Sequence, residues 1–419
     1  MRNESLFITG GSRLSGPVSI EGAKNAALPE CVAALLTDAP VVLHRIPELR
    51  DVSTILFTLS DLGKRVVRRG TSVVLASDRP LSSEANAYSV RQMRASFLVL
   101  GPIVARLGRA TVPLPGGCAI GERSVDLHLS GLRSLGARIS ERGSAVYVEA
   151  DRLQGTRIEL AFPSVGTTEQ LLMAAALARG ETEIRGASIE PEVIDLIALL
   201  RRMGSEIAIE DRTLRIAGRE ELGGAEHSVV SDRMEAGTYL IAGAITGGEV
   251  RVEGADAEAL DPLLRTLDEM GVQTRVEEGA VSVVGGGRPR ATRVETAPHP
   301  GFPTDLHPPV AALLALAEGT SRITETVFER RHTYVEGLRA MGAQIALDGP
   351  NVAISGVPVL RGRRMTAPDI RAGAALVLAG LAASGESEID GLDKIDRGYA
   401  AMERKLCELG ATIERRSAS

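Results

Sequence analysis

Six stretches of the chain are apolar on nearly every side, and they recur along its whole length. They cover residues 25–36, 94–107, 168–178, 235–245, 308–317 and 371–383. A helix without a polar face has to be buried. The pattern therefore predicts six buried helices, each belonging to one copy of a repeated unit.

An amphipathic helix is expected after each apolar stretch, as in residues 191–203, and it ends in Leu-Gly or Met-Gly before a β-like run. The six glycines are Gly63, Gly136, Gly204, Gly271, Gly342 and Gly410, at spacings of 73, 68, 67, 71 and 68 residues. A glycine just after a helix end is typical of left-handed backbone. Each unit is therefore predicted to run β-α-β-α-β-β.

A unit of this size has only a marginal core by itself, so the units are expected to pool their buried helices in two groups of three. This predicts an α/β fold of two similar domains, each with three units around buried helices. A linear solenoid is the alternative. Solenoid repeats usually run about 20 to 45 residues and lack an internal helix in every repeat, which disfavours it.

Composition and charge limit the partners and the cellular location that we expect for this protein. The 419 residues are 44% hydrophobic and 24% charged, with a formal net charge of -6, so we expect no nucleic-acid partner. Three cysteines without metal or disulfide spacing indicate a reducing compartment, and we expect a cytoplasmic protein. The apolar runs stop short of the ~18 residues that span a bilayer, so no membrane insertion is expected.

Cations stand at the heads of four of the predicted buried helices: Lys24, Arg94, Arg233 and Arg371. A helix N-terminus favours anions, and guanidinium groups bind carboxylate and phosphate in bidentate fashion. A solvated surface lysine is the alternative for Lys24. Four equivalent positions favour a cleft that binds a small polyanion, supplied from both domains and closing when the ligand binds.

Cys118 follows Pro115-Gly116-Gly117, in a segment too rich in glycine for a helix or strand interior. It is expected to be an exposed thiol whose pKa is lowered by Arg123, or else an incidental surface cysteine. Cys31 and Cys407 lie in helical patterns and are expected to be buried.

Asp305 stands at the head of the fifth buried helix, where other units carry cations. It is either a partner of the helix dipole or a general base aimed at a hydroxyl. Arg331 and the Asp396-Arg397 pair are expected to start outer helices. Simple helix capping is the alternative for the Asp396-Arg397 pair. Nucleotide-binding loops and metal-ligand spacings are absent from the sequence, so we expect no metal and no cofactor.

The chain resembles the UDP-N-acetylglucosamine enolpyruvyl transferases over nearly its whole length. The resemblance is carried by GAKNAALP, MRASFLVLGP, LPGGCAIGERSVDLHLSGL, FPSVGTTE, SDRMEAGTYL, PGFPTD, ITETVFERR, DIRAGAALVLAG and IDRGY. It implies an inside-out α/β barrel of two domains. We expect the catalytic domain to comprise residues 1–22 plus 232–419, and the second domain, with the Cys118 loop, to comprise residues 23–231.

The resemblance implies transfer of enolpyruvate from phosphoenolpyruvate to the 3-hydroxyl of UDP-N-acetylglucosamine, with release of phosphate and without a cofactor. This is the first committed step of peptidoglycan synthesis. The catalytic residues implied are Cys118, also the target of fosfomycin, with Asp305, Lys24 and Arg397. The implied substrate-binding residues are Asn25, Arg94, Arg123, Val125, Asp126, Leu127, Ser164, Val165, Gly166, Val327, Arg331 and Arg371.

The sequence departs from the family pattern at two places. His307-Pro308-Pro309 follows Asp305, and we expect the helix to start at Pro308 and to leave Asp305 in a loop. Ser124 stands where proline is usual. Two alternatives stay open: a paralogue that acts on another uridine nucleotide in nucleoside-antibiotic biosynthesis, and a non-catalytic UDP-sugar sensor.

Overall fold

The computed structural model describes residues 4–115 and 124–417. The chain forms two compact units. Residues 4–21 and 231–417 belong to unit 1, and residues 22–115 and 124–230 belong to unit 2. Each unit contains three of the six predicted repeats.

Unit 1 contains both strands that precede residue 21 and everything from α8 onward. Its elements are β1 (Glu4–Thr9), β2 (Ser15–Ser19), α8 (Arg233–Thr246), β14 (Glu249–Glu253), α9 (Ala257–Glu269), β15 (Gln273–Glu277), β16 (Ala280–Val284), β17 (Arg293–Glu295), η3 (Thr304–Leu306), α10 (His307–Leu314), β18 (Thr320–Thr324), η4 (Arg331–Tyr334), α11 (Val335–Ala340), β19 (Gln344–Asp348), β20 (Asn351–Ser355), β21 (Arg364–Thr366), α12 (Ile370–Ala382), β22 (Glu386–Asp390), α13 (Leu392–Ile395), α14 (Met402–Glu408) and β23 (Thr412–Ser417).

Unit 2 begins with a buried helix and ends with a strand that pairs with β3. Its elements are α1 (Lys24–Ala33), η1 (Ala34–Leu36), β3 (Val41–His44), α2 (Arg50–Leu62), β4 (Lys64–Arg69), β5 (Ser72–Ser77), α3 (Ala87–Gln92), η2 (Arg94–Val99), α4 (Leu100–Leu107), β6 (Arg109–Pro113), α5 (Asp126–Ser134), β7 (Arg138–Arg142), β8 (Ala145–Glu149), β9 (Arg157–Glu159), α6 (Val165–Ala175), β10 (Glu181–Arg185), α7 (Pro191–Arg202), β11 (Glu206–Glu210), β12 (Thr213–Ala217) and β13 (Ala225–Ser228).

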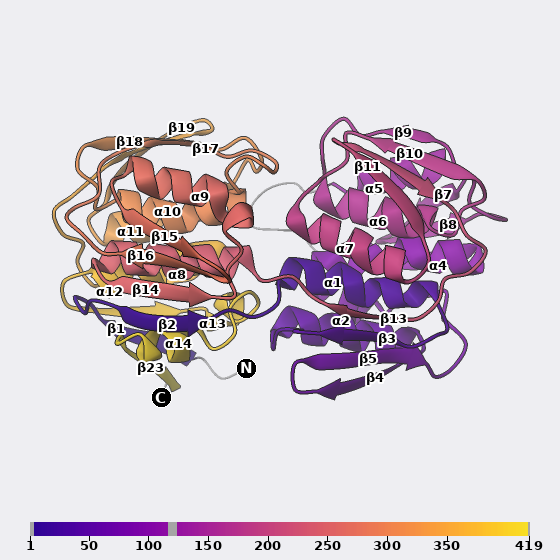
Figure 1. Ribbon diagram of the computed structural model, residues 1–419, viewed down its shortest axis with the longest axis horizontal. Coiled ribbons are helices and arrows are strands. Elements are labelled where there is room, and N and C mark those ends of the chain that lie inside the picture. Colours follow the sequence, from indigo (N-terminus) through magenta and orange to yellow (C-terminus); the bar gives the residue numbers. More distant parts are fainter. Residues whose placement is uncertain (1–3, 116–123, 418–419) are drawn as a thin grey trace. The chain divides into compact units, whose positions relative to one another are not determined.

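The predicted buried helices are confirmed, and within each unit they pack against one another. In unit 1 these are α8, α10 and α12, which lie alongside one another in Figure 1. In unit 2, α1, α6 and the η2–α4 segment form the corresponding group. Almost every residue of α1, α6, α8, α10 and α12 is buried, as their lack of a polar face requires, and in the η2–α4 segment residues 96–104 are buried.

Five of the six sheets in the described part of the chain are of mixed direction, and the sheet of the second repeat pairs its three strands antiparallel. In the fifth repeat, β17 pairs in parallel with β18, which continues antiparallel to β20 and then β19. Burial alternates along β20, so one face of the strand meets the core. This confirms the β-α-β-α-β-β order, except in two repeats. In the second repeat a single bridge, Glu84–Thr111, replaces the first strand, and in the sixth repeat only β23 follows the outer helices.

Some sheets include one strand that is distant in sequence from the others. Strand β13 pairs in parallel with β3, and β1 lies between β22 and β23. The terminal segments of each unit therefore close its set of three sheets.

The repeated glycines have the backbone that their spacing predicts. All six follow a helix end and have positive φ, from 77° at Gly271 to 119° at Gly63. A side chain is strained in this region, which explains why glycine recurs there. Within residues 4–115 and 124–417, none of the helices combines the length and hydrophobicity needed to cross a membrane.

Candidate functional site

Cations open the buried helices at four equivalent positions, as the repeat predicts. Lys24 begins α1, Arg94 begins η2, Arg233 begins α8, and Arg371 is the second residue of α12. Three of the four are buried; Arg94 is half-buried. Buried charges need partners of opposite sign, so each position requires a carboxylate, a phosphate or another anion.

In unit 1, Asp305 lies between two guanidinium groups. Its Oδ1 accepts a hydrogen bond from Arg331 Nη2 at 2.5 Å, and its Oδ2 accepts one from Arg371 Nε at 3.0 Å. The arginine side chains are 3% and 4% exposed, whereas Asp305 is 27% exposed. The carboxylate therefore neutralises two buried cations while part of it still faces solvent.

The expectation that Asp305 lies in a loop was wrong. Residues 304–306 form the η3 turn, and α10 begins at His307, one residue earlier than expected. Pro308 and Pro309 occupy the first helical turn, where the amides have no partner within the helix, so a missing N–H costs little. Both ring nitrogens of His307 are hydrogen-bonded, one to Glu325 and the other to Tyr334, and these bonds stabilise His307 at the start of the helix.

Arg371 is positioned by its neighbours along α12 and by an aromatic ring. Asp369 caps the helix by accepting from the backbone N–H groups of Arg371 and Ala372, and the guanidinium lies 5.3 Å from the ring centroid of Tyr399. Burial alone would lower the pKa of Arg371, but Asp305 raises it above the usual value. Among the described residues, Nη1 of Arg371 has no hydrogen-bond partner. This buried donor is available for an anionic ligand.

A buried network beside Asp305 holds the segment that contains Val327. Glu325 Oε2 lies 2.8 Å from His307 Nδ1, and His307 Nε2 lies 2.8 Å from the hydroxyl of Tyr334. Glu325 Oε1 accepts from the amides of Val327 and Phe328. Burial lowers the pKa of His307 to about 4. Burial opposes ionisation of Glu325, but His307 and the two amides lower the pKa of that carboxyl to about 2.

Arg397 is half-buried and follows α13. The expectation that Asp396 and Arg397 start an outer helix was wrong, because Asp396 ends α13 and α14 begins only at Met402. The Asp396 carboxylate instead pairs with Arg415 of β23 at 2.6 Å. Arg331 does begin η4, which leads into the outer helix α11.

In unit 2, Lys24 is held by a partner that the sequence did not indicate. Its Nζ lies 3.3 Å from Oδ2 of Asp51, and both side chains are buried. Asp51 lies in the first turn of α2, which packs against α1. Asn25, the next residue of α1, is half-buried.

Arg94 forms a hydrogen bond with the backbone immediately before residues 125–127. Its Nη2 donates to the carbonyl oxygen of Ser124 at 2.8 Å. The Ser124 hydroxyl accepts from the amide of Asp126, the first residue of α5, with Val125 at the N-cap position and Leu127 next along the helix. Serine thus supplies a capping hydrogen bond in place of the rigidity of proline.

The segment of residues 164–166 begins α6 and lies against α5. Ser164 caps the helix by accepting from the amide of Thr167, and Val165 is its first residue. A Cβ added at Gly166 would lie 3.4 Å from the ring of His128 in α5. Residues 124–127 and 164–166, widely separated in sequence, are therefore brought to adjoining helix starts within unit 2.

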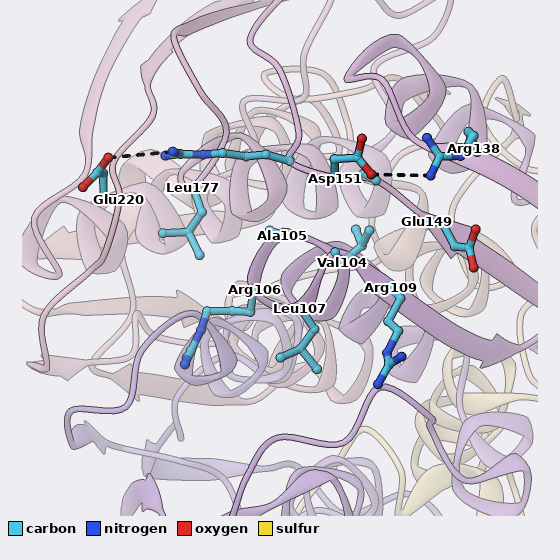
Figure 2. A pocket seen from close by; sticks show the side chains of 13 residues that line it. Val104, Ala105, Arg106, Leu107, Arg109, Arg138, Glu149, Asp151, Leu177 and Glu220 are labelled. Atoms are coloured by element: carbon cyan, nitrogen blue, oxygen red, sulfur yellow. Dashed lines mark ion pairs between the residues drawn. The ribbon is translucent and has the colours of Figure 1, made fainter.

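A separate polar pocket of about 560 Å³ lies elsewhere in unit 2. Figure 2 shows the side chains that line it, among them Arg106, Arg109, Arg138 and Asp151. Arg138 and Asp151 form an ion pair at 3.7 Å, and both are exposed. None of the residues predicted to bind substrate lines this pocket.

The cysteine expectations have different outcomes. Cys118 and Arg123 lie outside the described residues. Cys31 is buried as predicted, and burial raises the pKa of its thiol. The prediction that Cys407 is buried was wrong: the thiol is exposed and donates to the carbonyl of Ile413. Its position on the amphipathic α14 falls on the solvent side.

The fold and the cations at its buried helix starts define a protein of the enolpyruvyl transferase class. It is similar over its full length to the solved enolpyruvyl transferase NikO from Streptomyces tendae, with a TM-score of 0.90 and 26% identity, covering 100% of both chains. The EPSP synthase of Acinetobacter baumannii has the same fold, with a TM-score of 0.76 at 19% identity over 99% of this chain and 100% of that one.

The chain belongs to the EPSP synthase family, whose model, described as EPSP synthase (3-phosphoshikimate 1-carboxyvinyltransferase), matches residues 8–406. Two curated relatives are each 48% identical to it. The UDP-N-acetylglucosamine 1-carboxyvinyltransferase 1 of Symbiobacterium thermophilum aligns over 99% of this chain and 95% of its own length. The UDP-N-acetylglucosamine 1-carboxyvinyltransferase 2 of Carboxydothermus hydrogenoformans aligns over 98% and 99%.

Proposed function

We propose that the protein transfers the carboxyvinyl group of phosphoenolpyruvate to the 3-hydroxyl of UDP-N-acetylglucosamine and releases phosphate, as the first committed step of peptidoglycan synthesis. The observation that carries this proposal is the group formed by Asp305, Arg331 and Arg371. It combines a carboxylate that is partly open to solvent with a buried guanidinium donor that has no partner among the described residues. The names of the relatives at 48% identity support the acceptor.

In this proposal the residues of unit 1 contribute to the binding of both substrates. Arg371, together with Arg331, binds the carboxylate of phosphoenolpyruvate, because a planar guanidinium matches a carboxylate in geometry and charge. The Asp305 carboxylate accepts the proton of the acceptor hydroxyl as its oxygen bonds to the second carbon of phosphoenolpyruvate. The network of Glu325 holds the Val327 segment against the acceptor.

The remaining steps concern the phosphate and the methylene carbon. Cys118 gives a proton to the methylene carbon, so the addition product has a methyl group and retains phosphate. Loss of phosphate and of one methyl proton then restores the double bond. Lys24, Arg123 and Arg397 bind the phosphate, and positioned cations stabilise the charge that develops as it leaves.

The acceptor nucleotide is assigned to unit 2. Asn25 contacts the acceptor, and Arg94 and Arg123 flank the nucleotide. The starts of α5 and α6 supply residues 125–127 and 164–166, and the N-terminal ends of helices favour an anion. The free thiols of Cys31 and Cys407 support a cytoplasmic location.

Mass spectrometry of the purified protein with phosphoenolpyruvate and a panel of uridine nucleotides tests the proposal. UDP-N-acetylglucosamine should gain one carboxyvinyl group in place of a hydrogen, with one phosphate released per product. Uridine diphosphate, which lacks the N-acetylglucosamine 3-hydroxyl, is the matched control and should give no product. Product from a different uridine nucleotide alone would overturn the acceptor, and nucleotide binding without any product would favour a sensor.

A further inference from the structure

Three buried side chains of unit 2 meet away from the residues assigned to substrate. Glu30 comes from α1, Asp195 from α7 and His227 from β13. Nε2 of His227 lies 2.9 Å from Oδ1 of Asp195 and 3.6 Å from Oε1 of Glu30. One nitrogen and two carboxylate oxygens, each from a different element, are thus within 4.8 Å of one another.

The Glu30 carboxylate is the exceptional member of this group. Its side chain has no exposed surface, and neither oxygen has a hydrogen-bond partner among the described residues. A buried carboxylate is strongly unfavourable unless it is closely paired or binds a metal, and the 3.6 Å contact with His227 is too long for a hydrogen bond. A single proton would satisfy one carboxylate oxygen and leave the other without a partner.

We propose that Glu30, Asp195 and His227 bind a first-row divalent metal ion, of which Zn²⁺ is the best fit. Zinc binds imidazole nitrogen and carboxylate oxygen at about 2.0 to 2.2 Å, so ligand atoms of a tetrahedral site lie about 3.3 to 3.6 Å apart. The observed separations of 2.9 and 3.6 Å need only small shifts to meet this.

Charge and ligand type point to the same ion. Two carboxylates and a neutral imidazole carry a formal charge of -2, which a divalent cation neutralises. An imidazole ligand favours zinc over Mg²⁺ or Ca²⁺, which prefer oxygen ligands. The amide of Val230 donates to Oδ2 of Asp195 at 2.8 Å and so orients that carboxylate.

The metal would be structural, because it joins three elements inside unit 2. Helix α1 contacts α7, and α7 contacts β13. Glu30 lies six residues after Lys24 on α1, about 9 Å along the helix axis at 1.5 Å per residue. An ion at Glu30 would thus fix the helix that presents Lys24.

Metal content tests the site directly, with no need for an activity assay. The full-length protein is produced in zinc-supplemented medium, its accessible thiols are alkylated so that they do not bind zinc, and weakly bound metal is removed by gel filtration. Plasma mass spectrometry then measures zinc per chain for the wild type, Glu30→Gln and His227→Gln. Glu169→Gln is the matched control, since it removes another buried carboxyl of unit 2 that is outside the three ligands.

We expect about one zinc per chain in the wild type and in Glu169→Gln, and at least about tenfold less zinc per chain in Glu30→Gln and His227→Gln. Circular dichroism establishes that each variant is folded. Replacing zinc by Co²⁺ in the wild type should give visible absorption bands of a site with one nitrogen and two oxygen ligands from the protein, and Glu30→Gln should weaken these bands. Wild-type protein with less than about a tenth of an equivalent, or Glu30→Gln with undiminished zinc, would overturn the proposal.

Discussion

Replacing Asp305 by asparagine separates catalysis from binding in unit 1. The variant keeps the shape of the side chain and one oxygen acceptor, but it removes the charge that Arg331 and Arg371 share. If the carboxylate takes the proton of the acceptor hydroxyl, turnover depends on that charge. Binding of the nucleotide, which is assigned to unit 2, does not.

Two magnitudes follow from this geometry. Loss of a general base typically reduces turnover by about 100-fold to 10,000-fold, which at 1.36 kcal/mol per factor of ten is about 2.7 to 5.4 kcal/mol. Breaking a fully buried ion pair costs about 3 to 5 kcal/mol of stability. Asp305 is 27% exposed, so water partly replaces the lost interaction, and we expect a smaller loss of about 1 to 3 kcal/mol.

Phosphate release measures turnover, calorimetric titration with UDP-N-acetylglucosamine measures binding, and urea unfolding measures stability. Asp390→Asn is a matched control because Asp390 is 28% exposed and pairs with Arg364, outside the proposed site. It should keep its turnover and lose less stability than Asp305→Asn, because its partner Arg364 is 70% exposed whereas Arg331 and Arg371 are buried. A folded Asp305→Asn protein with turnover within about twofold of wild type would refute the catalytic role, as would parallel losses of turnover and nucleotide binding.

Three further predictions concern pH, backbone strain and thiol reactivity. Because burial lowers the pKa of His307 from 6.5 to about 4, the unfolded chain binds a proton in this range that the folded chain does not. The free energy of unfolding should therefore fall as the pH is lowered through this window, and His307→Gln should flatten the dependence in urea titrations; equal slopes would contradict this. Gly204 has a φ of 101° and open space around its Cα, so Gly204→Ala should cost about 1 to 2 kcal/mol of stability through strain alone. Gly287→Ala, also in open space but without positive φ, should cost much less in the same assay. Cys118 should be alkylated before the chain's other two cysteines in peptide mapping, and earlier labelling of either of those would exclude a low pKa for this thiol.

Local patterns in the sequence were sufficient to predict the repeat and the burial of its central helices. A helix that is apolar on all sides must be buried. A glycine after a helix end indicates left-handed backbone, and this conclusion does not depend on the tertiary contacts around it. For the same reason the first-turn positions of Lys24, Arg94, Arg233 and Arg371 were predictable: they follow from where each buried helix begins.

Only the tertiary structure decided which charges meet. Asp305 and Arg371 are 66 residues apart and belong to different repeats, and no local pattern relates the direction of one side chain to the other. Glu30, Asp195 and His227 lack metal-ligand spacing because each comes from a different element. The periodicity of a sequence predicts which face of a single helix or strand is apolar. It does not predict which side chains of separate elements meet, because that depends on how the helices and sheets pack in three dimensions.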